Sequence, residues 1–422
     1  MKRGFLNSKK GKAAIASDAS SAASAPDKKP DGKPGEGQGG EASTARPVNA
    51  REDLILVPGA SLSEMKESPG DFLEYDAKTF VITTIPARDK DTSVRTPTER
   101  SDGWAEAIID GDTKRAIFSQ RAFPASVSHP SSAGHCVEPT NGAKGVFATR
   151  RLKQGELILA ERPLVMVPRA MVSGDEILAT SMIPGSAERA AWLDVLVQRM
   201  LPDRREVLLR LTHAPAGDKL SAIDLIRANG LTVNGYTLPE TEGADGRYVA
   251  VYETLSRANH SCRPNAHFAF HKPSFSVRLR ALRDIKAGEE ILISYVPPEA
   301  PYAQRQEELA HYGLSCACGV CDEGPSADER RARLAASLVE DSTRSKKQEF
   351  DRISQQIALF EREGLAGLDV YMNNILYGLR LAAGVGEWEK CGVYNEKMTA
   401  IMPLYADEMG EEQAEQLSFL GL

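Results

Sequence analysis

The chain has 422 residues, more than one hydrophobic core usually organises, so we expect two or three structural units. Its 52 basic and 59 acidic side chains leave a net charge of -7, which argues against direct nucleic-acid binding. No apolar run reaches the roughly 18 residues that span a bilayer, so no membrane association is expected. Three of the six cysteines lie close together, as in a metal site of an intracellular protein.

The N-terminal segment 1–50 has a composition that cannot build a core. Residues 17–50 are mainly Ser, Ala, Gly, Pro, Lys and Asp, with Val48 as the only large aliphatic residue. Such a segment buries too little apolar area to offset its chain entropy, which predicts a disordered tail. In residues 51–130, apolar patches at 80–82 and 107–109 alternate with breaker-rich stretches, which predicts a partly ordered region that packs in part on the next domain.

Strand patterns follow from residue 133 onward. The apolar segments 145–149 and 157–159 flank the turn-like 153–155, which predicts a hairpin. Residues 275–281 alternate apolar and polar side chains, which predicts a half-buried strand. The run 291–293 is wholly apolar and predicts a more fully buried strand.

Helical patterns occupy two other parts of the chain. Between about 174 and 247, apolar residues at helical spacing predict an amphipathic insert between the two groups of strands; they are Leu193, Leu196, Val197, Met200 and Leu201. Past residue 325, Ser326 and Glu329 have capping-box spacing. Apolar stripes then continue on either side of Gly364, which is a plausible helix end, so we expect antiparallel helices over 325–422.

The cysteine cluster predicts a tetrahedral zinc site. Cys316, Cys318 and Cys321 put three thiolates on one tight loop, and the metal needs a fourth soft ligand from elsewhere. Four residues are candidates for that ligand: Cys262 and His260, which lie in one short polar segment, and the less well placed His311 and Cys391. The alternative is a redox-active or merely buried thiol cluster, but the distant cysteine in a polar turn favours zinc.

Four elements in chain order carry a resemblance to a known family. They are Gly145-Val-Phe-Ala-Thr with Gly155-Glu-Leu-Ile-Leu, then Asn259-His-Ser-Cys-Arg-Pro-Asn265, Gly288-Glu-Glu-Ile-Leu-Ile-Ser-Tyr295 and Cys316-x-Cys-x-x-Cys321. In this order they resemble a split SET domain with its cysteine-rich post-SET loop. The helical insert and the later helices are most similar to the SET-and-MYND branch and related fungal-type SET proteins, although the sequence has no second cysteine cluster for a MYND zinc finger.

The resemblance implies an α+β fold of small β-sheets. The SET domain would cover 133–295, with a knot-like crossing between the Asn259 segment and the strand that ends at Tyr295. The post-SET loop would cover 312–323, and a C-terminal helical region would follow over 325–422. The resemblance also implies one structural zinc, which would tie the post-SET loop to the core; its ligands would be Cys262, Cys316, Cys318 and Cys321.

For function, the resemblance implies a protein-lysine N-methyltransferase of the SET type that uses S-adenosylmethionine. In-line methyl transfer needs a neutral amine, which a dry channel beside the sulfonium favours through desolvation and like charge. The substrate would be a histone tail or another protein with an exposed lysine, in the nucleus, the cytoplasm or both. The C-terminal helices would be available to contact the substrate or partners. The alternative is a catalytically idle, zinc-stabilised scaffold.

The resemblance assigns roles to individual residues, and the retention of Tyr295, Asn259 and His260 together favours the enzyme. Tyr295 and Tyr312 would be catalytic, with the Tyr295 hydroxyl at the junction of the cofactor and the lysine channel. The residues expected to bind the cofactor are Lys144, Gly145, Val146, Asn259, His260 and Leu314. Ala143 replaces the first glycine of the family's usual Gly-x-Gly, and Leu314 stands where an aromatic ring often covers the adenine.

Overall fold

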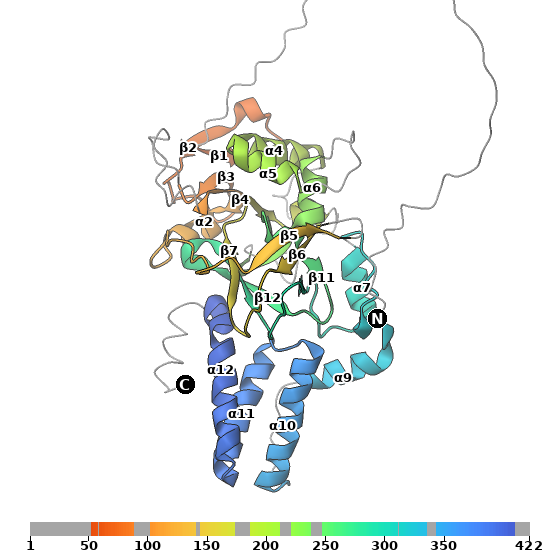
Figure 1. The fold of residues 1–422 in the computed structure, drawn as a ribbon. Helices are drawn as coiled ribbons and strands as arrows, with labels where there is room; N and C mark the ends of the chain where they lie inside the picture. The colour runs from red at the N-terminus through yellow and green to blue at the C-terminus, as the bar shows by residue number, and fades with distance from the viewer. Residues whose placement is uncertain are drawn as a thin grey trace, which may run out of the picture.

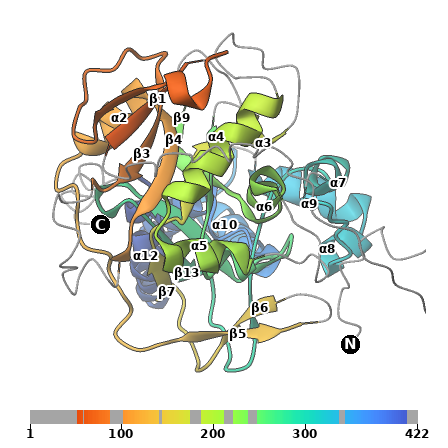
Figure 2. The same ribbon diagram turned by 90° about the horizontal axis from the view of Figure 1, so that it is seen from above.

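The computed structural model describes residues 52–57, 59–87, 102–140, 144–173, 186–211, 221–237, 247–310, 312–335 and 343–409. The expected N-terminal tail, Ala143 and His311 lie outside these ranges. Within them, three sheets form the core, which lies between the helices of the insert and a bundle of C-terminal helices (Figure 1). Figure 2 shows the same order from above, with the insert helices nearest the viewer and the bundle behind the core.

The largest sheet has seven strands in the order β2-β1-β3-β4-β8-β10-β9. Its strands are β1 (Glu52–Leu56), β2 (Lys66–Pro69), β3 (Phe80–Ile85), β4 (Ala105–Asp110), β8 (Val165–Pro168), β9 (Leu231–Thr237) and β10 (Arg247–Val251). All neighbours are antiparallel except β4 and β8, which pair in parallel. Both β3 and β4 are buried along their whole length, so the region before residue 130 shares its core with the strands that follow.

Two smaller sheets complete the core. One has the order β11-β14-β6-β5, and the other has the order β12-β13-β7. Their strands are β5 (His135–Pro139), β6 (Lys144–Ala148), β7 (Leu157–Glu161), β11 (Asn259–His260), β12 (Ala266–His271), β13 (Ser276–Ala281) and β14 (Glu290–Ile293). The predicted half-buried strand at 275–281 is confirmed as β13, preceded by Phe275 in the left-handed region at φ 48°.

Two strand predictions were wrong. The expected hairpin of 145–149 with 157–159 does not form, because β6 pairs with β5 and β14 while β7 pairs with β13 in another sheet. The linking segment turns toward that other sheet instead, where the backbone N–H of Gly155 donates to the carbonyl of Ala281 at 2.8 Å. The run 291–293 is not buried throughout, because Leu292 is partly exposed between the buried Ile291 and Ile293.

The described residues between 174 and 247 contain three helices and the strand β9. The helices here are α4 (Ser186–Arg199), α5 (Pro202–Leu209) and α6 (Ala222–Asn229), after the short α2 (Gly111–Phe118) and α3 (Ala170–Ser173). Leu193 and Leu196 are fully buried, as their helical spacing predicts, whereas Met200 and Leu201 follow the end of α4. Outside the insert, the described residues contain three short 3-10 turns: η1 (Leu62–Glu64), η3 (Leu255–Arg257) and η4 (Lys272–Ser274).

The described residues after 301 contain helices and no named strand; the helical region was expected only from 325, and α7 and α8 precede it. The helices are α7 (Tyr302–Ala310), α8 (Gly319–Asp322), α9 (Pro325–Ala335), α10 (Lys346–Glu363), α11 (Asp369–Val385) and α12 (Trp388–Met409). Gly364 ends α10 at φ 71°, as predicted. The predicted cap at Ser326 was wrong, because its hydroxyl donates to the carbonyl of Glu323; the capping box is Ser345 with Gln348, at the start of α10. None of the described helices is long and apolar enough to cross a membrane.

The bundle of α10, α11 and α12 joins the core through α12. The buried carboxylate of Asp407 accepts from Arg278 at 2.5 Å and from Arg280 at 2.6 Å, both on β13. On the loop before β7, Gly155 lies so close to α12 that a Cβ atom would be 1.7 Å from the carbonyl oxygen of Ala400. The absence of a side chain at Gly155 is therefore a condition for this contact.

This contact predicts different effects for two glycines that share one backbone conformation. Gly155 has φ 78° and Gly288 has φ 75°, but nothing lies within 4 Å of a Cβ at Gly288. We expect Gly288→Ala to cost about 1 kcal/mol of unfolding free energy, the penalty of the left-handed backbone alone. Gly155→Ala should cost about 3 kcal/mol or more, because α12 must also move away. Chemical denaturation measures both values, and equal losses would contradict the close contact.

Candidate functional site

The site is organised around the segment that runs from Ala258 to Asn265, beside β14. The two residues of β11 pair in parallel with β14, with Asn259 opposite Leu292 and His260 opposite Ile293. At its far end, Asn265 donates its backbone N–H to the carbonyl of Leu292 at 3.1 Å, and its side-chain oxygen accepts the N–H of Leu292 at 2.8 Å. The segment therefore leaves β14 and returns to it, which is consistent with the expected crossing.

Tyr295 follows β14 directly and is fixed by this segment. Its hydroxyl donates to the carbonyl of Ala258 at 2.7 Å, and its backbone N–H donates to Nδ1 of His260 at 3.1 Å. Burial raises the pKa of Tyr295 above its ordinary value of 10, and the nearby Tyr312 and Glu290 add to the increase. The hydroxyl is therefore protonated at neutral pH, and its lone pairs remain able to accept a hydrogen bond from an amine.

Tyr312 and Leu314 come from the post-SET loop and lie beside Tyr295. The rings of Tyr295 and Tyr312 have centroids 5.3 Å apart at an angle of 46°. Burial also raises the pKa of Tyr312, although Arg169 opposes the shift. Both Leu314 and Tyr295 are partly buried against the apolar cluster that contains the cysteines. The structure thus brings both predicted catalytic tyrosines to one place, next to the post-SET loop.

His260 uses both ring nitrogens within the protein. Nδ1 accepts the N–H of Tyr295, which leaves the ring proton on Nε2, 3.3 Å from the sulfur of Cys262. Burial lowers the pKa of His260 to about 4, so the ring is neutral at pH 7. The imidazole therefore links Tyr295 to the cysteine cluster, and a cofactor could reach this residue only through its backbone.

The other predicted cofactor residues meet where β6 begins. The amide of Asn259 donates to Oε1 of Glu290 at 2.7 Å and to the carbonyl of Lys144 at 3.4 Å. A Cβ atom on Gly145 would lie 2.7 Å from the same Oε1, so this glycine makes room for the carboxylate. Val146 is fully buried in the core, where its side chain cannot meet a ligand. Sequence reasoning missed Glu290, although it lies inside the segment from Gly288 to Tyr295.

The four predicted zinc ligands converge. Among the described residues, the sulfurs of Cys262, Cys316, Cys318 and Cys321 all lie within 4.8 Å of one another. Their closer separations are 3.6 Å, 3.8 Å and 3.9 Å, while a tetrahedral zinc with bonds of about 2.3 Å requires sulfurs about 3.8 Å apart. Cys391 belongs to the bundle on α12 and takes no part. The donor set and its spacing therefore fit one zinc ion.

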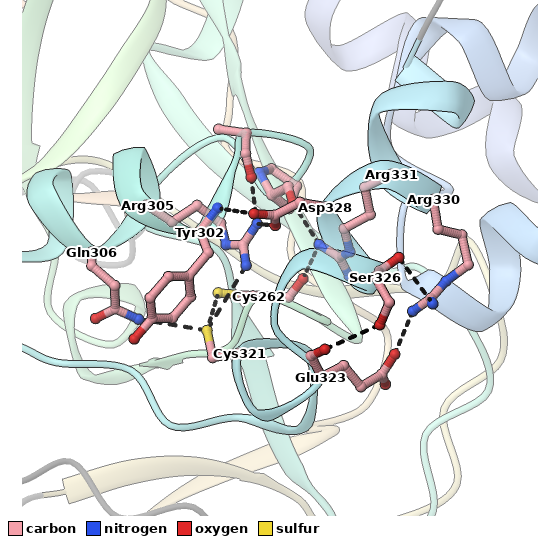
Figure 3. A network of polar contacts seen from close by, with 12 residues as sticks. Cys262, Tyr302, Arg305, Gln306, Cys321, Glu323, Ser326, Asp328, Arg330 and Arg331 are labelled. Carbon is pink, nitrogen blue, oxygen red and sulfur yellow. Dashed lines mark hydrogen bonds and ion pairs between the residues drawn. The ribbon is translucent and has the colours of Figure 1, made fainter.

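A buried ion pair connects this cluster to the C-terminal helices. Arg331 on α9 is fully buried and donates to the carbonyl of Cys262 at 2.8 Å (Figure 3). It also donates to the carboxylate of Glu363 at 3.2 Å and to the carbonyl of Glu363 at 2.7 Å, where α10 ends. Because one guanidinium binds both residues, the segment that contains Cys262 and the end of α10 are held in a fixed relation.

A family model described as SET domain matches residues 143–296, a range that runs from β6 to the residue after Tyr295. This part of the chain is a SET domain. The matched range contains β11, β14 and the segment from Ala258 to Asn265, so the residues around Tyr295 belong to the SET domain. The post-SET loop and the helices after it follow the matched range.

Relatives of this SET-domain chain include proteins named histone-lysine N-methyltransferase. One from Schizosaccharomyces pombe is 25% identical over 281 residues, which cover 63% of this chain and 76% of that protein. One from Homo sapiens is 32% identical over 108 residues, which cover 25% of this chain and 23% of that protein. A SET and MYND domain-containing protein of Dictyostelium discoideum is 30% identical over 115 residues, which cover 26% of this chain and 22% of that protein. The chain spans less than a quarter of these last two relatives.

Proposed function

We propose that this SET-domain protein transfers a methyl group from S-adenosylmethionine to the side-chain amine of a lysine in a protein substrate. The observation that carries the proposal is the partly buried Tyr295 hydroxyl, held by the carbonyl of Ala258 beside the ring of Tyr312. A scaffold would need neither this hydroxyl nor its fixed direction. The names of the relatives support the same chemistry.

The residues around Tyr295 would position the reacting groups. S-adenosylmethionine supplies an electrophilic methyl group on a sulfonium when it is bound. The backbone of Lys144, Gly145 and His260, with Asn259, would hold this cofactor, and Leu314 would cover its adenine. The two tyrosine rings would form the wall of a dry channel in which a lysine amine loses its proton more readily, because desolvation disfavours the ammonium. The Tyr295 hydroxyl would then accept a hydrogen bond from the neutral amine and aim its lone pair.

The substrate would be a protein with an exposed lysine, and histone tails fit this class because the relatives are named for histone lysine methylation. These relatives support action in the nucleus, the cytoplasm or both. The bundle of α10, α11 and α12 stands beside the core and would contact the substrate or a partner protein (Figure 1).

One structural zinc would complete the site, bound by Cys262, Cys316, Cys318 and Cys321. Serine at position 318 would replace a thiolate with a weaker ligand, so we expect Cys318→Ser to lose the metal and to loosen the post-SET loop. Metal analysis should find one zinc per wild-type chain and much less than one in the variant. Serine at Cys391, outside the cluster, is the matched control, and it should keep the full zinc content. A Cys318→Ser protein with undiminished zinc would refute the assignment.

Cofactor binding should raise the melting temperature, as any ligand that prefers the native state must do. Asn259→Ala removes the amide that joins Glu290 to the carbonyl of Lys144, so the shift produced by S-adenosylmethionine should become smaller. Asn395→Ala, at an exposed position of the bundle, is the control and should keep the wild-type shift. An unchanged shift in the Asn259→Ala protein would remove this residue from the proposed cofactor site.

Tyr295→Phe tests the proposed function most specifically, because it deletes one oxygen and keeps the ring. If the hydroxyl aims the amine, the rate of methyl transfer should fall about a hundredfold or more, the scale expected for misplaced reacting groups. Cofactor affinity and zinc content should change little. Tyr302→Phe, an exposed tyrosine on α7, should retain the wild-type rate. Equal rates for wild type and Tyr295→Phe, measured with labelled cofactor, would discard this account of the site.

A further inference from the structure

Two neighbouring side chains of α7 reach the cysteine cluster from outside it. They are Arg305 and Gln306, and both point toward Cys321 in Figure 3. Neither residue belongs to the four-sulfur set, and neither lies in the segments that resemble the SET family. Their contacts nevertheless help to fix the positions of the cysteines and bring hydrogen-bond donors and a positive charge close to a sulfur.

Gln306 fixes the backbone of one cysteine and touches the sulfur of another. Its side-chain oxygen accepts the N–H of Cys316 at 3.1 Å, and its side-chain nitrogen donates to the carbonyl of Cys316 at 2.8 Å. The same nitrogen lies 3.6 Å from the sulfur of Cys321. One amide therefore holds both polar groups of Cys316 while it presents an N–H to a second sulfur.

Arg305 brings a positive charge to the same sulfur. Its side chain is fully buried, and one guanidinium nitrogen lies 3.9 Å from the sulfur of Cys321. The other terminal nitrogen donates to the carbonyl of Ala300 and to Asp328, which lies 3.2 Å away on α9. These contacts fix the cation against the cluster rather than in solvent.

Four thiolates around one Zn²⁺ carry a net charge of about -2, which is costly to bury without nearby donors or cations. Outer-shell groups that orient the ligands typically change metal affinity about 10- to 100-fold when they are removed. Gln306 orients a ligand because it holds Cys316. Arg305 supplies the nearby cation because its buried guanidinium lies against Cys321.

We propose that α7 forms the outer shell of the metal site, in which Gln306 orients Cys316 and Arg305 and Gln306 together stabilise the thiolate of Cys321. This inference rests on the proposed zinc site and deepens it. The two residues are positioning residues for the metal and would set its affinity, although neither binds it directly.

The experiment measures zinc affinity in the full chain by competition with a chromogenic chelator. Gln306→Leu keeps much of the side-chain volume but removes the amide, so zinc should bind about 10- to 100-fold more weakly. Gln304→Leu is the matched control, because Gln304 is an exposed residue of the same helix and its side chain donates to Glu308. Its affinity should equal that of wild type.

Gln306→Glu separates the two parts of the amide. It keeps an acceptor for the N–H of Cys316 but replaces the donor with a negative charge beside Cys321, so zinc binding should be at least as weak as in Gln306→Leu. The charge-transfer absorption of the Co²⁺-substituted protein, which reports the metal–thiolate bonds, should shift in both variants and not in Gln304→Leu. If Gln306→Leu does not fold, Arg305→Met replaces it; this change removes the positive charge beside Cys321, so weaker zinc binding is again expected.

Two failures can be told apart. Wild-type protein without stoichiometric zinc would overturn the metal site and this inference with it. Wild-type protein that holds zinc, together with Gln306 variants of unchanged affinity and unchanged Co²⁺ spectrum, would overturn the outer-shell role alone. A loss of thermal stability that is equal in metal-free and zinc-loaded protein would likewise reduce Gln306 to a structural support of the loop.

Discussion

The parallel pairing of β11 with β14 is the interaction on which the rest of the site depends. It involves two residues on β11, too few to be stable alone, so its surroundings must hold it. Asn265 does so from one end, where its amide donates to the carbonyl of Glu290 at 2.8 Å and its oxygen accepts from Leu292. With the pair in place, the carbonyl of Ala258 faces the Tyr295 hydroxyl and the sulfur of Cys262 enters the cysteine cluster.

The same segment makes the C-terminal helices part of the site rather than an appendage. Arg331 binds the carbonyl of Cys262 and pairs with Glu363, and both side chains are almost completely buried. Removal of one partner from such a pair leaves an uncompensated buried charge, which is far more costly than the pair is stabilising. The arrangement therefore favours one orientation of the bundle, and Asp407, near the end of α12, fixes the same core-facing end of the bundle against β13.

Sequence motifs were enough to find several residues that the structure brings together, but they did not reveal the neighbours of these residues. Cys262, His260 and Tyr295 lie in short contiguous motifs, so local pattern and resemblance were enough to find them. The hairpin prediction failed because two apolar segments on either side of a turn-like stretch indicate strands but do not show which strand each of them pairs with. The parallel pairing of Glu106 with Val165, and the contact of Gln306 with Cys316, join residues that the folded chain alone brings together. No periodicity in the sequence encodes such contacts.

The central claim is that this site methylates lysine, and the most direct measurement is the location of a transferred methyl group. Purified protein would be incubated with S-adenosylmethionine carrying an isotopically labelled methyl group, together with histones and a cell extract. Mass spectrometry would then locate the label. The account predicts labelled methyl groups on the side-chain nitrogen of lysine in at least one protein. Protein that binds the cofactor and yet labels no lysine would contradict the account and favour a SET-fold scaffold.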